Sequence, residues 1–319
     1  MGKYLINKLI SVITTLFILS IFIFGLTHVM AGDPAQAMLG SNADSTQIEA
    51  LREEMGLNRP LVEQYVDWVS DAVRGDLGDS YFRHQSVTAA LAERIGPSLI
   101  LSFWSELIAV VLAIPLGIVA AKRKGEAADV AVSATAMLGM SMPSFLLGLL
   151  LILVFGVFLG ILPVSGYVTI AKGGLLEHIR YLVLPCVTMG LIQSALILRI
   201  TRSSFLDVLN TDYIKTAKAK GLKQKVILYK HVFRNAASTI VTILGQSFGS
   251  LLAGVAVLET MFNIPGMGQL IVDSVLKRDY PVIQGAILFI SLIYIIINLI
   301  VDVSYGIIDP RIRIAGSAK

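Results

Sequence analysis

The stretch PSLILSFWSELIAVVLAIPLGIVAA, residues 97–121, contains a single charged side chain, Glu106. An α-helix rises about 1.5 Å per residue, so roughly 20 apolar residues cross the hydrocarbon core of a bilayer, which is about 30 Å thick. The stretch is therefore long enough and apolar enough to span a membrane as one helix. A chain that contains such a segment is expected to sit in a lipid bilayer.

Five further segments share this character. Of the 319 residues, 55% are hydrophobic and 15% are charged, whereas a soluble domain is about 25% charged; the mean hydropathy is +0.76. The segments lie at about 9–30, 131–160, 179–200, 237–258 and 282–306. Because none shows strand-type alternation, the sequence predicts an all-α, polytopic membrane protein with six transmembrane helices rather than a barrel.

Two of these segments have features of their own. The third contains Pro143, and since proline removes a backbone hydrogen bond and clashes with the preceding turn, we expect a kink there. The first resembles a secretory signal followed by AQA at residues 35–37. A signal's apolar region is about 7–15 residues long, and this one exceeds twenty. We therefore interpret residues 1–30 as an N-terminal transmembrane helix.

Lysines and arginines in short loops indicate which side of the membrane is cytoplasmic. Residues 199–235 carry nine of them against two aspartates, and the N-terminal tip, the 122–129 loop and the C-terminal tail are also basic. All four regions lie on one side of a six-span arrangement. The sequence thus predicts that both termini are cytoplasmic and that residues 31–96 lie outside.

The outer segment, residues 31–96, is expected to be helical. DSTQIEALREEMG predicts a helix with Asp44 as N-cap, Gln47 three residues later and Gly56 as its stop. NRPLVEQYVDWVSDAVRG predicts a second, amphipathic helix that ends at Gly75. Two roles are open: the helices cap the chain's own bundle, or they receive a partner.

The stretch DYIKTAKAKGLKQKVILYKHVFRNA, residues 212–236, contains seven lysines or arginines. Asn210 or Thr211 is expected to cap a short helix that begins near Asp212 and ends at Gly221. Such a segment is compatible with anchoring to anionic membrane lipid, with nucleic-acid binding, or with docking into a groove of a cytoplasmic partner. No stacking or base-reading pattern supports nucleic acid. Docking makes use of the alanines and the glycine stop, which lipid anchoring does not need.

The order of residues in this loop is similar to that of a known family. Tyrosine, a basic residue, TA, a basic residue, AKGL and then HVxRNA occur from Tyr213 to Ala236. This resembles the cytoplasmic loop of permease subunits in the peptide and nickel branch of the ATP-binding-cassette (ABC) importers. MGLNRPLVEQY, GDLGDSY, ETMFNIPGMGQL, RDYPVIQG and NLIVDVSYGIIDPRIR extend the resemblance to the B-type subunit over essentially the whole chain. The general E-A-A loop pattern of importers is matched only at Ala217 and Gly221.

The resemblance implies a permease subunit of a dipeptide or oligopeptide importer, with six helices of the type I importer kind. In that family this loop inserts into a cleft of the ATPase and transmits its closure. The implied ATPase-docking residues are Tyr213, Thr216, Ala217, Lys218, Ala219, Gly221 and Leu222. The implied partners are a homologous second permease, two cytoplasmic ATPase subunits and an extracytoplasmic substrate-binding protein.

No catalytic motif occurs in the sequence. It contains no GxxxxGK[ST] phosphate loop, HExxH, CxxC or nucleophile elbow, so we expect a transport subunit rather than an enzyme. This chain is expected to bind no cofactor, and ATP and Mg would belong to the partner ATPases. The four histidines are scattered along the chain, so a solvated or interfacial role is expected for each rather than metal binding.

Polar residues inside the spans are candidates for function. A carboxylate at mid-bilayer costs roughly 2.5–3.5 kcal/mol on insertion scales, so it usually faces a cavity or a partner. Two roles are open for Glu106: lining the translocation path or pairing with the companion subunit. Gln246 is grouped with it, and both Gln193 and Gln246 are able to hydrogen-bond between helices. Asp302 is expected to pair with Arg199 or Arg202.

The stretch NIPGMGQLIVDSV, residues 263–275, predicts a tight turn followed by a short amphipathic helix. In the resembling family this region forms an outer gate helix near the subunit interface. Asn263, Pro265 and Gly266 are therefore further candidates for the path or the interface. The alternative is a plain connecting loop.

The chain is thus divided into an N-terminal transmembrane helix (1–30), an extracytoplasmic helical segment (31–96), a permease core (97–306) and a cytoplasmic tail (307–319). The core includes a coupling loop at 201–235 and an outer gate loop at 259–281. We expect a multi-pass protein of the bacterial plasma (inner) membrane. The nearest alternative imports nickel or a metal chelate. An ion-driven secondary carrier is the alternative from another class, although carriers often show repeated halves, which are not seen here.

Overall fold

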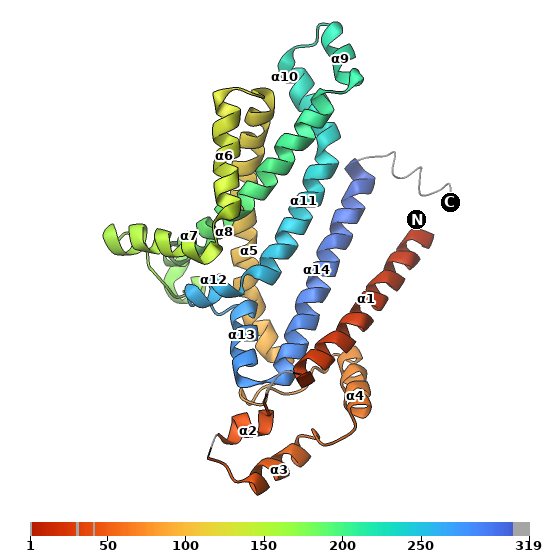
Figure 1. Cartoon of the computed structure of the whole chain (residues 1–319), viewed down its shortest axis with the longest axis vertical. Helices are drawn as coiled ribbons and strands as arrows, with labels where there is room; N and C mark the ends of the chain where they lie inside the picture. Colours follow the sequence, from red (N-terminus) through yellow and green to blue (C-terminus); the bar gives the residue numbers. More distant parts are fainter. Residues whose placement is uncertain (1, 30–31, 41, 309–319) are drawn as a thin grey trace. The chain divides into compact units, whose positions relative to one another are not determined.

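The computed structural model describes residues 2–29, 32–40 and 42–308. Within these ranges the regular structure is helical and forms no strands (Figure 1). The elements are α1 (Gly2–Val29), α2 (Pro34–Leu39), α3 (Ser45–Glu54), α4 (Leu61–Val73), α5 (Val87–Lys122), α6 (Ala127–Ser141), α7 (Ser144–Leu151), the π-helical η1 (Ile152–Phe158), α8 (Ile170–Leu209), α9 (Asp212–Ala219), α10 (Gln224–Val226), the π-helical η2 (Ile227–Val232), α11 (Phe233–Gly254), α12 (Ala256–Met261), α13 (Met267–Lys277) and α14 (Tyr280–Ile308). Of the predicted tail 307–319, residues 309–319 lie outside the described residues.

The prediction of an all-α, polytopic membrane fold is confirmed. Among the described residues, the segments long and apolar enough to cross a membrane are Lys8–Val29, Val87–Lys122, Ile170–Leu209 and Tyr280–Ser304. The bent pair Ala127–Ser141 and Ser144–Phe158 adds one more if it counts as a single span. The remaining predicted span, 237–258, overlaps α11 and the start of α12. It is not among the segments that meet this criterion within the described residues.

Pro143 breaks the third predicted span into two helices rather than kinking one. The second part leaves α6 at an angle of 103°, and Figure 1 shows α7 running across the direction of α6. Met142 has φ −87° and ψ 124°, because the proline ring disfavours a helical conformation at the preceding residue. The turned helix is held by close packing, since a Cβ added at Gly148 would lie only 2.2 Å from Met261 Cε.

The chain divides into two compact units, Met1–Ser98 with Pro265–Ile295 and Leu99–Ile264 with Ile296–Lys319. The first unit has its own core, formed by Val87, Leu91, Met267, Leu270, Val282 and Ala286. Polar contacts tie its distant segments together. The Asp279 carboxylate, 2% exposed, accepts from Ser80 Oγ at 2.5 Å and from Tyr81 N at 3.1 Å. Burial raises the pKa of the Tyr81 phenol to about 12, and the neighbouring Asp279 charge acts in the same direction.

The two outer helices form as the sequence predicts. Asp44 and Gln47 make a capping box at the start of α3, and Gly75 adopts φ 89° after α4. α4 packs on α1: Tyr65 OH lies 2.8 Å from Ser20 Oγ, and Trp68 stacks on Phe24 with a centroid distance of 6.0 Å. These two contacts favour the first of the two open roles for α4, packing on the chain's own helices.

The second unit is a bundle built around three apolar clusters. α5, α6, α8 and α11 form its long helices (Figure 1). One cluster joins α5, α8, α11 and α12 and includes Leu101, Leu182, Leu251, Leu258 and Phe262. A second joins α5, α6, α8 and α11 through Ala109, Ala136, Ile197 and Ile243. The third surrounds α9 and is described with the candidate site below.

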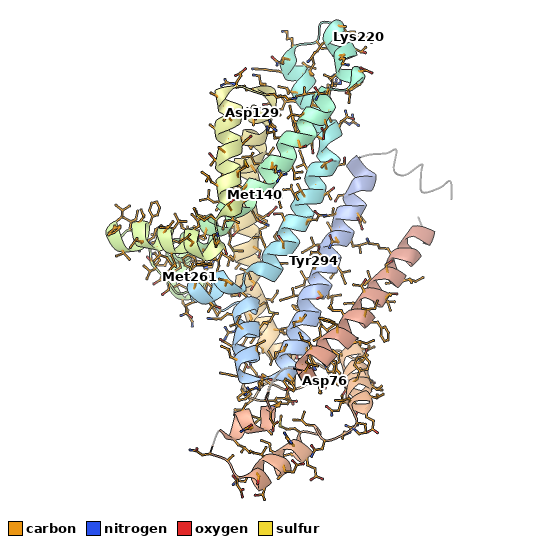
Figure 2. All side chains as sticks on the ribbon, viewed as in Figure 1. Asp76, Asp129, Met140, Lys220, Met261 and Tyr294 are labelled. Atoms are coloured by element: carbon orange, nitrogen blue, oxygen red, sulfur yellow. The ribbon has the colours of Figure 1, made fainter. Side chains whose placement is uncertain are left out.

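An ion pair links α6 to α8 inside this unit. Arg202 Nε lies 2.6 Å from Asp129 Oδ1, and its Nη2 lies 2.8 Å from Oδ2. The Asp129 side chain is only 6% exposed, and its Oδ2 also accepts from Gly125 N. Figure 2 places Asp129 near the start of α6. Arg202 therefore has a carboxylate partner other than the predicted Asp302.

Removing one member of this pair should destabilise the fold more than removing both. Arg202→Met leaves the buried Asp129 charge without its guanidinium, which we expect to lower the free energy of unfolding by about 3–5 kcal/mol. The double variant Asp129→Leu with Arg202→Met should recover most of this loss, because an apolar pair needs no counter-charge. The melting temperatures of both variants and the wild type are measured in detergent. If Arg202→Met melted at the same temperature as the wild type, the stabilising role of the ion pair would be contradicted.

Candidate functional site

α9 is a short, sharply ended helix, as the sequence predicts. Thr211 is its N-cap residue with extended φ/ψ, and Asp212 stands in its first turn, where a negative charge favours the helix N-terminus. Gly221 adopts φ 73°, a left-handed conformation that residues with a Cβ adopt reluctantly. A Cβ added there would meet nothing within 4 Å. The glycine is therefore required by backbone conformation and not by lack of space.

One face of α9 is buried in the chain's own core. Ile214 is 0% and Ala217 6% exposed. They belong to a cluster that we call the hinge cluster, with Ala121 of α5, Phe205 of α8, Ile227, Leu228 and Val232 of η2, and Ala236 and Ile240 of α11. An eight-residue helix is marginal alone in water, so this cluster holds α9 in place.

The other face of α9 is open. Among the predicted docking residues, Tyr213, Thr216, Lys218, Ala219, Gly221 and Leu222 are exposed, and Figure 2 shows Lys220 at the outer end of this segment. Ala217 is the exception, because it packs inward on the hinge cluster. The structure thus separates the predicted set into six residues available to a partner and one that anchors the helix.

A polar contact also ties α9 to the helix that follows it. Tyr213 OH lies 2.5 Å from His231 Nδ1, and the two rings meet edge-on at a centroid distance of 5.6 Å. His231 belongs to η2, which leads directly into α11. The contact adds a second connection between α9 and α11 beside the hinge cluster.

The second unit also contains a cavity of about 170 Å³. It lies among α7, α8, α11 and α12, and its lining residues are Ser144, Met189, Ile192, Gln193, Ser250, Leu251, Gly254 and Leu258. The walls are thus mostly apolar, with a few hydroxyl and amide groups. Such a lining suits a ligand with a polar backbone and variable apolar parts.

A buried polar network lies behind this cavity. Ser247 Oγ donates to Glu106 Oε2 at 2.6 Å, and Gln193 Nε2 donates to Ser247 Oγ at 3.0 Å. Glu106 is 9% exposed, and its Oε1 is buried and has no hydrogen-bond partner among the described residues. Glu106 is not among the residues that line the cavity; it lies inside the unit, between α5 and α11.

The remaining candidates are Gln246, Asn263, Pro265 and Gly266. Gln246 is exposed on α11. Asn263 is exposed and adopts φ 51°, while Pro265 is half-buried and Gly266 is the buried N-cap residue of α13. The predicted turn and short amphipathic helix are therefore present in this segment.

Sequence reasoning missed Ser144, Ser247 and Ser250. Serine is common in membrane helices and packs like alanine, so nothing in the pattern marks these three. These serines are marked only by their positions near Glu106 and Gln193, and those positions follow from the packing of α5, α7, α8 and α11. Within the described residues no group of three or more histidine, cysteine or acidic side chains is placed to hold a metal ion.

The comparison with protein families identifies the class of protein. Residues 113–314 match the model described as binding-protein-dependent transport system inner membrane component. Residues 1–102 match the N-terminal model of binding-protein-dependent transport system membrane components. The chain belongs to this family of ABC importer permease subunits, and it is a transport subunit rather than an enzyme.

Curated relatives place the chain more closely. It is 41% identical over 313 residues to a probable peptide ABC transporter permease protein, y4tP, of Sinorhizobium fredii, covering 98% of this chain and all of the relative. It is 43% identical over 313 residues to the glutathione transport system permease protein GsiC of Escherichia coli K12, covering 98% and 99%. The predicted resemblance to permeases of the peptide branch is confirmed.

A solved structure shows the same fold. The MetNI methionine ABC transporter in an inward-facing conformation aligns with a TM-score of 0.56 and 18% identity. The alignment covers 70% of this chain and 97% of the other. At this identity the comparison supports the permease fold and nothing finer.

The hinge cluster can be tested by loosening α9. Ile214→Ala removes a fully buried side chain, which typically costs about 2–5 kcal/mol, so α9 should detach more often. Limited trypsin digestion should then cut after Lys218 and Lys220 faster than in the wild type. Thr216→Ala, on the exposed face, is the control and should leave the rate unchanged; equal rates in all three proteins would contradict the anchoring role.

Proposed function

We propose that this chain is one of two membrane subunits of an ATP-driven, binding-protein-dependent importer of di- and oligopeptides. It forms half of the translocation path together with a homologous second permease. Two cytoplasmic ATPase subunits carry ATP and Mg, and an extracytoplasmic binding protein delivers the cargo. α9 is the coupling helix that docks on the ATPases, and both termini lie in the cytoplasm.

The observation that carries this proposal is the construction of α9. The helix begins after Thr211, is stopped by a glycine at its other end and is fixed along one face, so it is a short rod with an exposed outer surface. Helix-in-groove recognition uses such an element. Its exposed lysines favour an acidic partner surface and would strengthen the encounter at low salt.

The hinge cluster supports a route for the motion. It contains side chains from α5, α8, α9 and α11, and well-packed cores transmit displacement because they have little free volume. Closure of the ATPases would push α9, and the cluster would pass this push to three long helices at once. The bundles would then rock from inward-open to outward-open, and the binding protein would release its cargo.

The cavity supports the cargo class. Its few polar groups are suited to the amides that every peptide carries, and its apolar walls impose no charge selection. The names of the relatives agree with a peptide cargo, since glutathione is itself a tripeptide. Import of nickel or a metal chelate is the alternative within the same architecture.

Changing Gly221 should uncouple ATP hydrolysis from uptake. Gly221→Val places a β-branched residue at positive φ, which costs about 1–2 kcal/mol. A shift of that size lowers the ratio of docking-competent to detached α9 roughly five- to thirtyfold, so uptake per ATP should fall, by at most that factor, while the complex still assembles. Gly221→Asn is the matched control, because asparagine tolerates this conformation. Normal uptake by Gly221→Val would refute the docking role.

Cargo can be tested with the chain reconstituted in vesicles with its partners. We expect ATP-dependent uptake of dialanine, trialanine or glutathione and none of free nickel. Omitting the binding protein should abolish uptake, which separates this machine from an ion-driven carrier. Uptake of nickel in the absence of peptide would select the metal alternative.

A further inference from the structure

Gln193 on α8 points its amide nitrogen at three oxygen atoms of α11. Nε2 lies 3.0 Å from the Ser247 carbonyl oxygen, 3.0 Å from Ser247 Oγ and 2.9 Å from Ser250 Oγ. An amide nitrogen has two hydrogens to give, so its donors are fully used. The Gln193 amide oxygen makes no hydrogen bond within the described part of the chain.

None of these three oxygens has a proton to offer in return. Ser247 Oγ donates its proton to Glu106 Oε2 at 2.6 Å, and Ser250 Oγ donates its proton to the Ser247 carbonyl oxygen at 2.8 Å. A carbonyl oxygen only accepts. If the Gln193 amide turned over, its oxygen would face three acceptors and no donor. The orientation of the amide therefore follows from counting protons.

Glu106 is the reason why Ser247 cannot donate to Gln193. The side chain of Glu106 on α5 is buried, and it accepts the one hydrogen bond that the Ser247 hydroxyl is able to donate. Without this acceptor, the Ser247 proton would be free to turn toward Gln193. Glu106 thus fixes the orientation of the Gln193 amide indirectly, through its hydrogen bond with Ser247.

The Gln193 side chain lines the cavity of the second unit, next to Ser250. The unpaired atom of the Gln193 side chain is its amide oxygen, which accepts hydrogen bonds. The Ser250 hydroxyl already donates to the Ser247 carbonyl oxygen, so it is also an acceptor. Ser144, the other hydroxyl of the lining, makes no hydrogen bond to other described residues and is able to donate or accept. This wall favours a ligand that brings N–H donors, and Ser144 is compatible with the carbonyl beside each N–H of a peptide.

We infer that Gln193 determines specificity by accepting N–H groups of the cargo, and that Glu106 is a positioning residue that acts through Ser247. The inference rests on the proposed function, because it takes this cavity to lie on the route of a peptide. It names a property of the permease itself, separate from selection by the binding protein.

The test compares uptake of trialanine with uptake of its analogue methylated at both peptide nitrogens. For each variant, the uptake rate of trialanine is divided by that of the methylated analogue, and this ratio is divided by the same ratio for the wild type. Because the binding protein is unchanged, its contribution cancels in the resulting quotient. Gln193→Met should lower this quotient roughly three- to tenfold, the size of one lost hydrogen bond. Glu106→Leu should lower it in the same direction. Ser102→Ala, which removes another buried hydroxyl of α5, should leave it at one.

An unchanged quotient in an assembled Gln193→Met complex would overturn the inference. A second measurement does not depend on transport. Gln193→Glu places a carboxylate against the three acceptors and should melt at a lower temperature than Gln193→Met. Adding Glu106→Leu frees the Ser247 proton and should restore part of that loss. If Gln193→Glu and Gln193→Met melt alike, the hydrogen-bond directions are wrong and the inference fails.

The two proposals can fail separately. If the wild-type complex takes up no peptide, the proposed cargo is wrong, and the melting comparison alone decides whether Gln193 presents an acceptor. If the wild type takes up trialanine and the quotient does not move in Gln193→Met, the proposed function stands and the role of Gln193 is lost.

Discussion

The burial of Ile214 and Ala217 against the ends of α5, α8 and α11 is the contact on which the position of α9 depends, and with it the proposed coupling. α9 is too short to be stable alone, and its outer face is polar and exposed. Only the apolar inner face gives it a fixed position. The same cluster contains side chains from three long helices. In the proposed coupling, the contacts that anchor α9 would therefore also pass a push on α9 to these helices.

Polar groups between the long helices form a second level of organisation. Lipid offers no hydrogen-bond partner in the bilayer core, so polar side chains on neighbouring helices of the bundle bond to one another. Asp129 and Arg202 join α6 to α8 in this way, and Glu106, Ser247 and Gln193 join α5, α11 and α8. The first is a charge pair that fixes helix positions. The second is a chain of hydrogen bonds with a direction, which gives the neighbouring cavity a defined chemical character.

Local features of the fold could be read from the sequence with good precision. The capping box of α3, the start of α9 near Asp212, its end at Gly221 and a bend at Pro143 each depend on a few neighbouring residues, although the bend is a full break rather than the predicted kink. Partner choice could not be read in the same way. Arg202 pairs with Asp129, a partner that the sequence did not suggest, and Ala217 packs on the hinge cluster while the other predicted docking residues are exposed. Both outcomes depend on which helices meet.

The sequence by itself determined that the chain is helical and lies in a membrane, because segment length and apolarity act along the chain. Its motifs, such as the loop from Tyr213 to Ala236, carried the resemblance to importer permeases. Only the tertiary structure decided how far the chain turns at Pro143, which face of α9 is free and which oxygen atoms surround Gln193. Those properties arise from atoms that are distant in sequence. Pro143 ends α6, but the direction of α7 depends on the helices against which it packs, α8 and α12.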